Sequence, residues 1–173
     1  QQEIIKEVFE GKNILTVMPT GGGKSLCYQL PATLFDGLTL VVSPLIALMQ
    51  SQVAQLQLLG IKAYCLNSSN SDDENKAIIE MLKSNEVTLL YIAPERLIKN
   101  ETIDLLKTKK ISLLAIDEAH CVSQWGHDFR KEYLKLGEIR KELSMVQTIA
   151  LTATADQTTR KDIIDKIFPK KPS

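Results

Sequence analysis

The sequence predicts an α/β fold of three layers, in which helices cover both faces of a central, mostly parallel sheet. Four short runs are apolar nearly throughout, as strands buried on both faces are: Ile14–Val17, Leu38–Val42, Leu89–Ile92 and 113–116. Longer stretches with helical periodicity separate the runs. The repetition of strand, helix and strand favours right-handed crossovers and hence parallel strands.

The expected elements follow the chain in order. A helix over 1–10 presents one apolar face and ends at Gly11, which suits a C-terminal cap. Pro31 must bend or shorten a helix over 24–34, because proline has no N–H to donate. Gly60 ends a helix over 47–59. Strands are expected over 13–18, 38–42, 62–66, 87–92, 111–116 and 148–151, and further helices over 72–84 and 156–167.

Length and charge limit the class of protein. The chain has 173 residues, which suits one domain over 1–168 followed by a tail or linker over 169–173. It begins at Gln1 rather than Met, so we expect an N-terminally trimmed domain. Lys plus Arg and Asp plus Glu both number 21, which argues against a generic basic nucleic-acid binder but not against a local basic cleft.

The location expected from the sequence is intracellular. No apolar run approaches the roughly 18 residues of a membrane span, so no membrane partner is expected. Cys27, Cys65 and Cys121 are odd in number and widely spaced, which argues against a disulfide framework. We expect a cytoplasmic protein, associated with the nucleoid in a bacterium, or a nuclear one in a eukaryote.

A glycine-rich loop follows the first expected strand. Residues 18–25 read Met-Pro-Thr-Gly-Gly-Gly-Lys-Ser and lead into a helix, although Met18 occupies the first glycine position of the strict phosphate-loop pattern. Backbone N–H groups and the helix N-terminus of such a loop attract phosphate. Lys24 would pair with the β- and γ-phosphates, and Ser25 would bind Mg²⁺. We expect ATP to be bound by Thr20, Gly21, Gly22, Gly23, Lys24 and Ser25.

Two carboxylates end the buried strand over 111–116. Asp117 would hold Mg²⁺, partly through water, and Glu118 would orient and deprotonate the attacking water. His120 is either a sensor of the γ-phosphate or a satisfied polar residue, and its position alone does not decide. A zinc site made of His120, Cys121 and His127 has too few, too crowded ligands.

A short segment after the acidic pair holds the only Trp of the chain. Trp125 and Phe129 can stack on bases without reading sequence, and Arg130 can pair with phosphate or with an acidic neighbour. The alternative is a buried aromatic cluster. Ser43–Pro44 and Ala93–Pro94 each follow a buried strand and open a helix start that can take a phosphate, or they are ordinary turns.

Three segments together resemble the RecQ family of superfamily 2 DNA helicases. They are residues 19–29 (PTGGGKSLCYQ), 117–120 (DEAH) and 121–130 (CVSQWGHDFR). The resemblance covers essentially the whole chain and implies a P-loop NTPase, RecA-like fold. Lys131 stands where the family commonly has Pro.

The resemblance also implies roles for further residues. Gln1, 23 positions before Lys24, would recognise adenine. Thr152 and Thr154 would couple hydrolysis to unwinding. Contacts with DNA, or coupling to it, are implied for Ser43, Pro44, Ala93, Pro94, Glu95, Arg96, Ser123, Gln124, Trp125, His127, Phe129 and Arg130.

The function implied is that of the first of two RecA-like motor domains of a 3′–5′ DNA helicase in repair or recombination. Single-stranded and partly duplex DNA and a second RecA-like domain, which would supply an arginine finger, are the implied partners. This fragment alone is expected to bind nucleotide and not to unwind. The alternatives are a P-loop switch ATPase, a DNA-binding module with a vestigial site, and an RNA helicase of the same superfamily.

Overall fold

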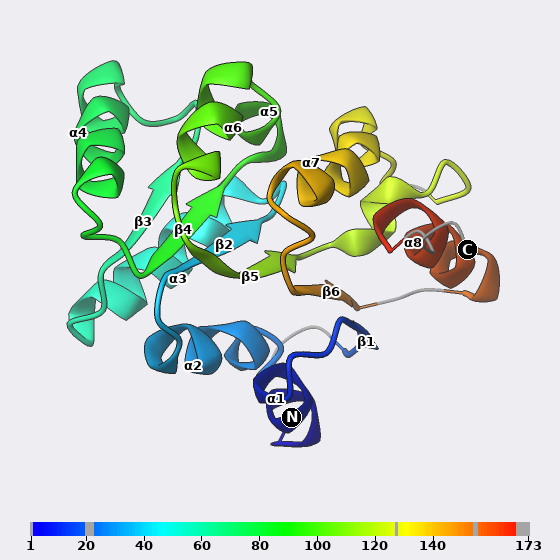
Figure 1. The fold of residues 1–173 in the computed structure, drawn as a ribbon. Helices are drawn as coiled ribbons and strands as arrows, with labels where there is room; N and C mark the ends of the chain where they lie inside the picture. Colours follow the sequence, from blue (N-terminus) through cyan, green and yellow to red (C-terminus); the bar gives the residue numbers. More distant parts are fainter. Residues whose placement is uncertain (1, 20–22, 127, 154–155, 169–173) are drawn as a thin grey trace.

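The fold is built on one six-stranded sheet, seen in the computed structural model, which describes residues 2–19, 23–126, 128–153 and 156–168 (Figure 1). The strands lie in the order β1-β6-β5-β2-β4-β3, and every neighbouring pair is parallel. Their bounds are β1 (Ile14–Val17), β2 (Leu38–Val42), β3 (Ala63–Leu66), β4 (Leu89–Ile92), β5 (Ile111–Ile116) and β6 (Thr148–Thr152).

Helices cover both faces of the sheet (Figure 1). One face carries α1 (Gln2–Phe9), α2 (Leu26–Leu34) and α3 (Ile46–Leu58). The other carries α4 (Asp72–Lys83), α5 (Pro94–Leu97), α6 (Asn100–Lys107), α7 (Leu136–Glu142) and α8 (Gln157–Ile167). Two short 3₁₀ helices, η1 (Ala119–Val122) and η2 (Lys131–Lys135), connect β5 to α7.

Alternation along the strands divides the core into two layers. In β2, Leu40 and Val42 face the layer of α4–α8, whereas Val41 faces that of α1–α3. Because successive side chains of a strand point to opposite faces, a strand covered on both faces needs apolar residues at consecutive positions. All five residues of β2 and all four of β4 are buried, which explains the continuous apolar runs in the sequence.

The predicted fold class is confirmed, and the predicted strands lie within two residues of the observed bounds. Pro31 lies inside α2, which begins at Leu26, and Gly11 and Gly60 have the positive φ of C-terminal caps. The helices α5, α6 and α7 and both 3₁₀ helices were not among the predicted elements. Across the part of the chain that the structure describes, no helix is both long enough and apolar enough to span a bilayer.

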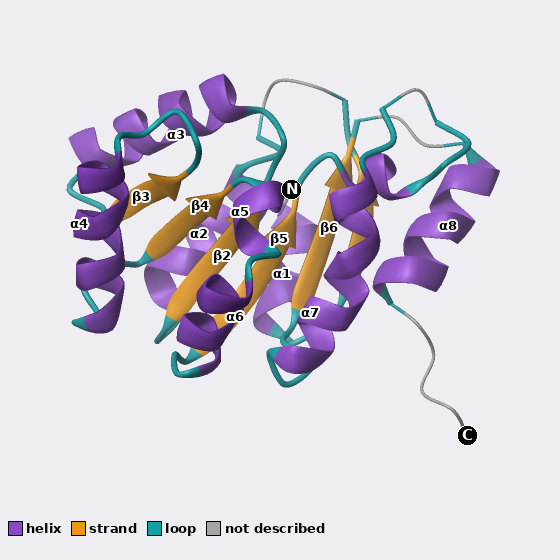
Figure 2. Ribbon diagram, turned by 90° about the horizontal axis from the view of Figure 1, so that it is seen from above, coloured by secondary structure: helices purple, strands orange, loops and turns teal. Residues whose placement is uncertain are grey.

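Parallel strands place their carboxyl ends at one edge of the sheet, and Figure 2 shows all arrowheads on the same side. Since β6 lies between β1 and β5, the segments after these three strands are neighbours. In the sequence, β1 leads into the glycine-rich loop, β6 into the segment with Thr152 and Thr154, and β5 into the acidic pair Asp117 and Glu118. The topology therefore assembles the predicted nucleotide-binding residues at one edge.

Candidate nucleotide-binding site

The glycine-rich loop starts and ends on fixed backbone. The N–H of Met18, directly after β1, donates to the carbonyl of Thr152 at the end of β6, at 2.9 Å. Gly23 has a φ of 93°, a left-handed conformation that suits glycine, and Ser25 is the first residue before α2. The predicted residues Gln1 and 20–22 lie outside the described residues, so their roles stay predictions.

Lys24 meets both predicted carboxylates. Its Nζ lies 2.9 Å from Oδ1 of Asp117 and 3.6 Å from Oε1 of Glu118. The three side chains are only 12%, 5% and 16% exposed. The structure thus brings together two segments 93 positions apart, as the phosphate-loop interpretation requires. The single positive charge of Lys24 offsets only one of the two carboxylate charges in this site, which is largely closed to water.

The backbone at Glu118 is left-handed, with φ 51° and ψ 45°. Such a conformation is uncommon for a residue with a side chain, and in this structure Asn85, Ser144 and Met145 also adopt a positive φ. The N–H of Glu118 donates to Oδ1 of Asp117 at 2.9 Å, and the N–H of Asp117 donates to the carbonyl of Val42 in β2. This turn at Asp117 and Glu118, the acidic turn, directs both carboxylates toward Lys24.

His120 lies in the site and is hydrogen-bonded there. Its Nδ1 is 2.7 Å from Oγ1 of Thr152, and its Nε2 is 3.5 Å from Oε2 of Glu118 and 3.3 Å from Oδ2 of Asp128. The ring connects the acidic pair to the end of β6 and to residues 123–130, the aromatic segment. His120 is thus a satisfied polar residue in this structure, and its position beside Glu118 also suits a sensor.

Burial keeps two neighbouring groups in their neutral forms. Burial, with the charge of Glu118 as a smaller cause, raises the pKa of the Cys121 thiol to about 12. Burial also raises the pKa of Tyr133 well above its ordinary value, and the Tyr133 hydroxyl donates to the carbonyl of Asp117 at 2.8 Å. Both groups therefore remain protonated near neutral pH, and Tyr133 remains a hydrogen-bond donor to the acidic turn.

The aromatic segment projects from the site. Trp125 is 79% exposed, which excludes a core role for this side chain, whereas Phe129 is half-buried and Gln124 and Arg130 are exposed. Ser123 is buried, donates to Oδ2 of Asp162 in α8 at 2.8 Å, and accepts from the N–H of Trp125. The base of the segment is therefore fixed and its aromatic tip is open to solvent.

In the two proline turns, Ser43–Pro44 and Ala93–Pro94, most side chains are buried in the protein. Ser43 is 2% exposed, and its hydroxyl accepts from the N–H of Leu45, as in an ordinary turn. Ala93 and Pro94 are buried, whereas Glu95 is exposed. Arg96 is half-buried beside a cavity of about 380 Å³ between α4 and α6, and its Nε has no hydrogen-bond partner among the described residues.

DNA contacts at these two turns stay predictions, as do those of His127 and Thr154. Pro44 is half-buried. His127 and Thr154 lie outside the described residues.

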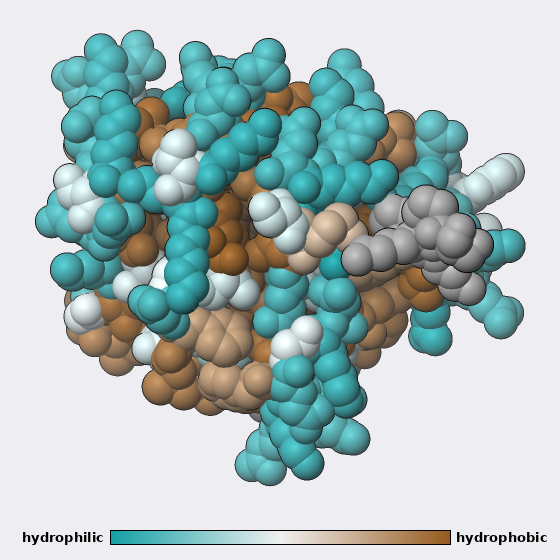
Figure 3. All heavy atoms as spheres, viewed as in Figure 1, coloured by the Kyte–Doolittle hydropathy of each residue, from teal (hydrophilic) through white to brown (hydrophobic). Residues whose placement is uncertain are grey.

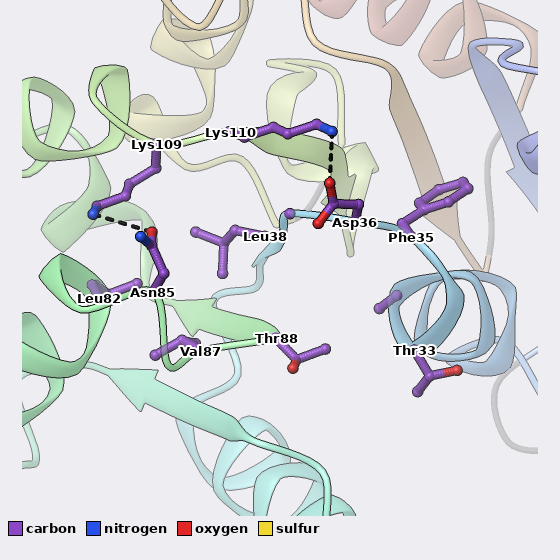
Figure 4. Close-up of a pocket in the computed structure, with 12 residues that line it drawn as sticks. Thr33, Phe35, Asp36, Leu38, Leu82, Asn85, Val87, Thr88, Lys109 and Lys110 are labelled. Carbon is purple, nitrogen blue, oxygen red and sulfur yellow. Dashed lines mark hydrogen bonds and ion pairs between the residues drawn. The ribbon is translucent and has the colours of Figure 1, made fainter.

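A separate pocket of about 540 Å³ opens at the opposite edge of the sheet, where the strands begin. Figure 3 views the molecule from this side, and the centre of the view shows hydrophobic residues between hydrophilic ones. Its lysines are already paired: Lys110 with Asp36 at 3.1 Å, and Lys109 with Asn85 at 3.3 Å (Figure 4). This pocket shares no lining residue with the cluster of Lys24, Asp117 and Glu118.

The donor set at the carboxyl edge fits a nucleotide and Mg²⁺. A hydroxyl at Ser25 and the carboxylates of Asp117 and Glu118 are hard oxygen ligands, which Mg²⁺ prefers. Phosphate groups fit an amine such as Lys24, which lies beside the positive end of the dipole of α2. The site can therefore bind a charged phosphate ester and polarise water next to it.

A scan against protein families decides the assignment. The model described as DEAD/DEAH box helicase matches residues 1–163. The chain belongs to the DEAD/DEAH box helicases. This helicase chain is 50% identical over 164 residues to the ATP-dependent DNA helicase RecQ of Haemophilus influenzae, covering 95% of the chain and 26% of the relative. It is 46% identical over 173 residues to the RecQ of Bacillus subtilis, covering 99% and 29%. The resemblance to RecQ helicases is confirmed.

Solved structures show the same fold. The helicase chain superimposes on the helicase domain of Pyrococcus furiosus Hef with a TM-score of 0.70 at 20% identity, covering 96% of the chain and 35% of that structure. The helicase Lhr of Mycobacterium smegmatis, solved with single-stranded DNA and AMP-PNP, gives a TM-score of 0.68 at 23% identity, covering 94% and 23%. The predicted RecA-like fold is thereby confirmed. The chain spans about a quarter of the length of the curated relatives named above.

Sequence reasoning missed three residues that the structure places at the site. Asp128 lies within the aromatic segment and pairs with His120, and Asp162 holds Ser123 from α8. Tyr133 contacts the backbone of the acidic turn from η2. A carboxylate inside a segment predicted to contact DNA was a usable signal for Asp128, but no local pattern indicates the partners of Tyr133 and Asp162.

Proposed function

We propose that the chain is the ATP-binding motor domain of a RecQ-like DNA helicase, which couples ATP hydrolysis to movement along single-stranded DNA and to duplex unwinding. The observation that carries the proposal is the contact of Lys24 with Asp117 and Glu118 at the carboxyl edge of the sheet. The names of the RecQ relatives support DNA as the nucleic acid. The proposed polarity, 3′ to 5′, and the role in repair or recombination follow the same relationship.

In the proposed mechanism, Lys24 exchanges its two carboxylate partners for phosphate oxygens of ATP. The exchange is supported by the negative charge that ATP spreads over several phosphate oxygens and by the N-terminus of α2, which attracts the same anion. Asp117 and Ser25 would hold Mg²⁺, which offsets phosphate charge when bound. Gln1 and residues 20–23 would complete the cradle.

Release from Lys24 leaves Glu118 free to act as a general base. Its carboxylate would accept a proton from the attacking water, while its left-handed backbone keeps it directed toward the site. His120 would orient Glu118 through the 3.5 Å contact, with its ring fixed by Thr152. The proposal therefore assigns the roles of base, cation and metal ligand to Glu118, Lys24 and Asp117, which lie in one cluster.

The exposed tip of the aromatic segment is proposed to contact DNA. Trp125 can stack on a base, and Arg130 can pair with a phosphate. A second RecA-like domain of a longer protein would close over the nucleotide and supply an arginine finger. Without it, the 173-residue fragment is expected to bind nucleotide but to hydrolyse it poorly and not to unwind DNA.

The test is ATP hydrolysis by the full-length protein, with and without single-stranded DNA. We expect strong stimulation by DNA, and loss of both rates in Lys24→Ala. Lys110→Ala is the matched control, because Lys110 makes an ion pair of similar length with Asp36 at the opposite edge of the sheet. Hydrolysis indifferent to DNA would support a switch ATPase, and stimulation by RNA alone would support an RNA helicase.

A further inference from the structure

The peptide that joins Asp117 to Glu118 is held on both of its sides. Its N–H, which belongs to Glu118, donates to Oδ1 of Asp117 at 2.9 Å. Its carbonyl, which belongs to Asp117, accepts from the hydroxyl of Tyr133 at 2.8 Å. Because this peptide precedes the left-handed residue Glu118, its orientation sets the direction in which the Glu118 side chain leaves the backbone.

Tyr133 is itself attached to the end of the aromatic segment. Its N–H donates to the carbonyl of Arg130 at 3.0 Å, and the N–H of Arg130 donates to the carbonyl of Cys121 at 2.9 Å. A displacement of Arg130 therefore reaches the carbonyl of Asp117 through a single residue, Tyr133, by way of its backbone N–H and its hydroxyl. The side chain of Tyr133 is fully buried, so the ring has no free volume in which to absorb such a displacement.

We propose that Tyr133 is a positioning residue that transmits the state of the aromatic segment to Glu118, through the bond from its hydroxyl to the Asp117 carbonyl. The inference rests on the proposed function, since it assumes that this segment binds DNA and that Glu118 is the base. The raised pKa of Tyr133 keeps the hydroxyl protonated at neutral pH, so the donor is always present.

The decisive variant is Tyr133→Phe, which keeps the ring and removes only the hydroxyl. In the full-length protein, we expect the DNA-stimulated rate of ATP hydrolysis to fall roughly tenfold, the usual effect of one lost hydrogen bond on a positioned group. The basal rate should fall less than the stimulated rate, because the protein without DNA has no bound segment whose state could be transmitted. The affinity for a fluorescent single-stranded oligonucleotide, measured by anisotropy, should stay within about twofold.

Tyr28→Phe is the matched control. Tyr28 is also buried, and its hydroxyl also donates to a protein oxygen, Oε1 of Gln52 at 3.1 Å. Both variants should lower the melting temperature by a similar amount, but only Tyr133→Phe should uncouple hydrolysis from DNA. A purely structural role of Tyr133 would lower stability in both variants without changing the ratio of stimulated to basal rate.

The remaining outcomes separate the two proposals. If the parent protein is stimulated by DNA and Tyr133→Phe is stimulated equally, the role of Tyr133 is overturned and the proposed function stands. If Tyr133→Phe loses DNA affinity in parallel with stimulation, Tyr133 only shapes the segment, and transmission is again overturned. If the parent protein is not stimulated by DNA, the proposed function fails, and the inference fails with it.

Discussion

The two edges of the sheet contain the same kind of bond in opposite surroundings. At the carboxyl edge, Lys24 lies 2.9 Å from Asp117, and the two side chains are 12% and 5% exposed. At the amino edge, Lys110 lies 3.1 Å from Asp36, and the exposures are 70% and 93%. An exposed ion pair contributes about 0–1 kcal/mol, whereas charges removed from water cost several kcal/mol unless they are well paired. Distance alone therefore says little about what a pair does.

The turns at the two edges differ in backbone as well. Before β2, the positive φ of 102° falls on Gly37, which adopts it without steric cost. After β5, the positive φ of 51° falls on Glu118, a residue with a side chain. Asn85, Ser144 and Met145, which precede β4 and β6, also have positive φ, so left-handed residues with side chains occur at both edges. Glu118 differs from these three in that its carboxylate lies 3.6 Å from a buried lysine, Lys24.

The largest effect is expected from Glu118→Gln. It removes the proposed base and keeps nearly the same shape, so ATP hydrolysis should fall about 10³-fold while nucleotide binding persists. Steady-state hydrolysis and binding of a fluorescent ATP analogue measure the two quantities. Glu142→Gln is the control, since Glu142 makes only an exposed 4.0 Å pair with Lys107. Equal rates of ATP hydrolysis in Glu118→Gln and Glu142→Gln would show that Glu118 in the buried cluster has no role in hydrolysis.

The amino edge should respond to changes in shape rather than in charge. In Gly37→Ala, the added methyl would lie 2.6 Å from Oγ of Ser112 and 2.7 Å from the carbonyl of Lys110, at a positive φ. We expect a loss of about 2–3 kcal/mol in unfolding free energy, from strain and overpacking together. Chemical denaturation measures this loss.

Gly11→Ala separates the two causes. Gly11 also has a positive φ, 82°, but nothing lies within 4 Å of the added methyl, so only the backbone cost of about 1 kcal/mol remains. Equal losses in the two variants would show that the close packing around Gly37 carries no energy. In neither variant should ATP hydrolysis per folded molecule change.

A smaller effect is expected at the exposed tip of the carboxyl edge. Trp125→Ala should weaken binding of single-stranded DNA by about 1–3 kcal/mol, the contribution of one stacked base. The melting temperature should not change, because Trp125 is 79% exposed. Anisotropy of a labelled oligonucleotide measures the affinity, and Leu58→Ala, which removes another exposed apolar side chain at the end of α3, is the control. Unchanged affinity would exclude stacking by Trp125.

The strands could be predicted from the sequence, whereas some of the helices could not. The strands could be predicted because burial on both faces forces a continuous apolar run, which a short window of sequence reveals. The helix α6 carries Ile103 and Leu106 at helical spacing and was a missed signal. In α7, Gly137 weakened the helical signal, and the structure explains its presence: an added methyl there would meet the carbonyl of Lys166 in α8.

The candidate site was predictable to the level of residue type. A glycine-rich loop after one strand and two carboxylates after another predicted that Lys24 and Asp117 share an edge, and the structure places them 2.9 Å apart. The left-handed backbone of Glu118 and the bond from Tyr133 were not predictable. They depend on how η1 packs against η2, β6 and α8, which is long-range geometry with no local sequence signal.

The smallest effect concerns the start of α8, where a carboxylate at the carboxyl edge has a purely structural role. The side chain of Asp156 accepts from the N–H of Thr159 at 2.7 Å, and this bond lowers the pKa of Asp156 below its ordinary value. A lowered folded-state pKa adds stability above the unfolded pKa of about 3.9, and that stability is lost as the pH falls through the folded pKa. Asp156→Asn keeps the cap without a titrating group.

The wild-type protein should therefore lose slightly more of its melting temperature between pH 6 and pH 3 than Asp156→Asn does. Asp165→Asn, which changes an exposed carboxylate near the other end of α8, is the control. An equal loss in the wild type and in Asp156→Asn would mean that ionisation of Asp156 adds nothing to stability at neutral pH. By linkage, the pKa of Asp156 would then be the same in the folded and the unfolded chain.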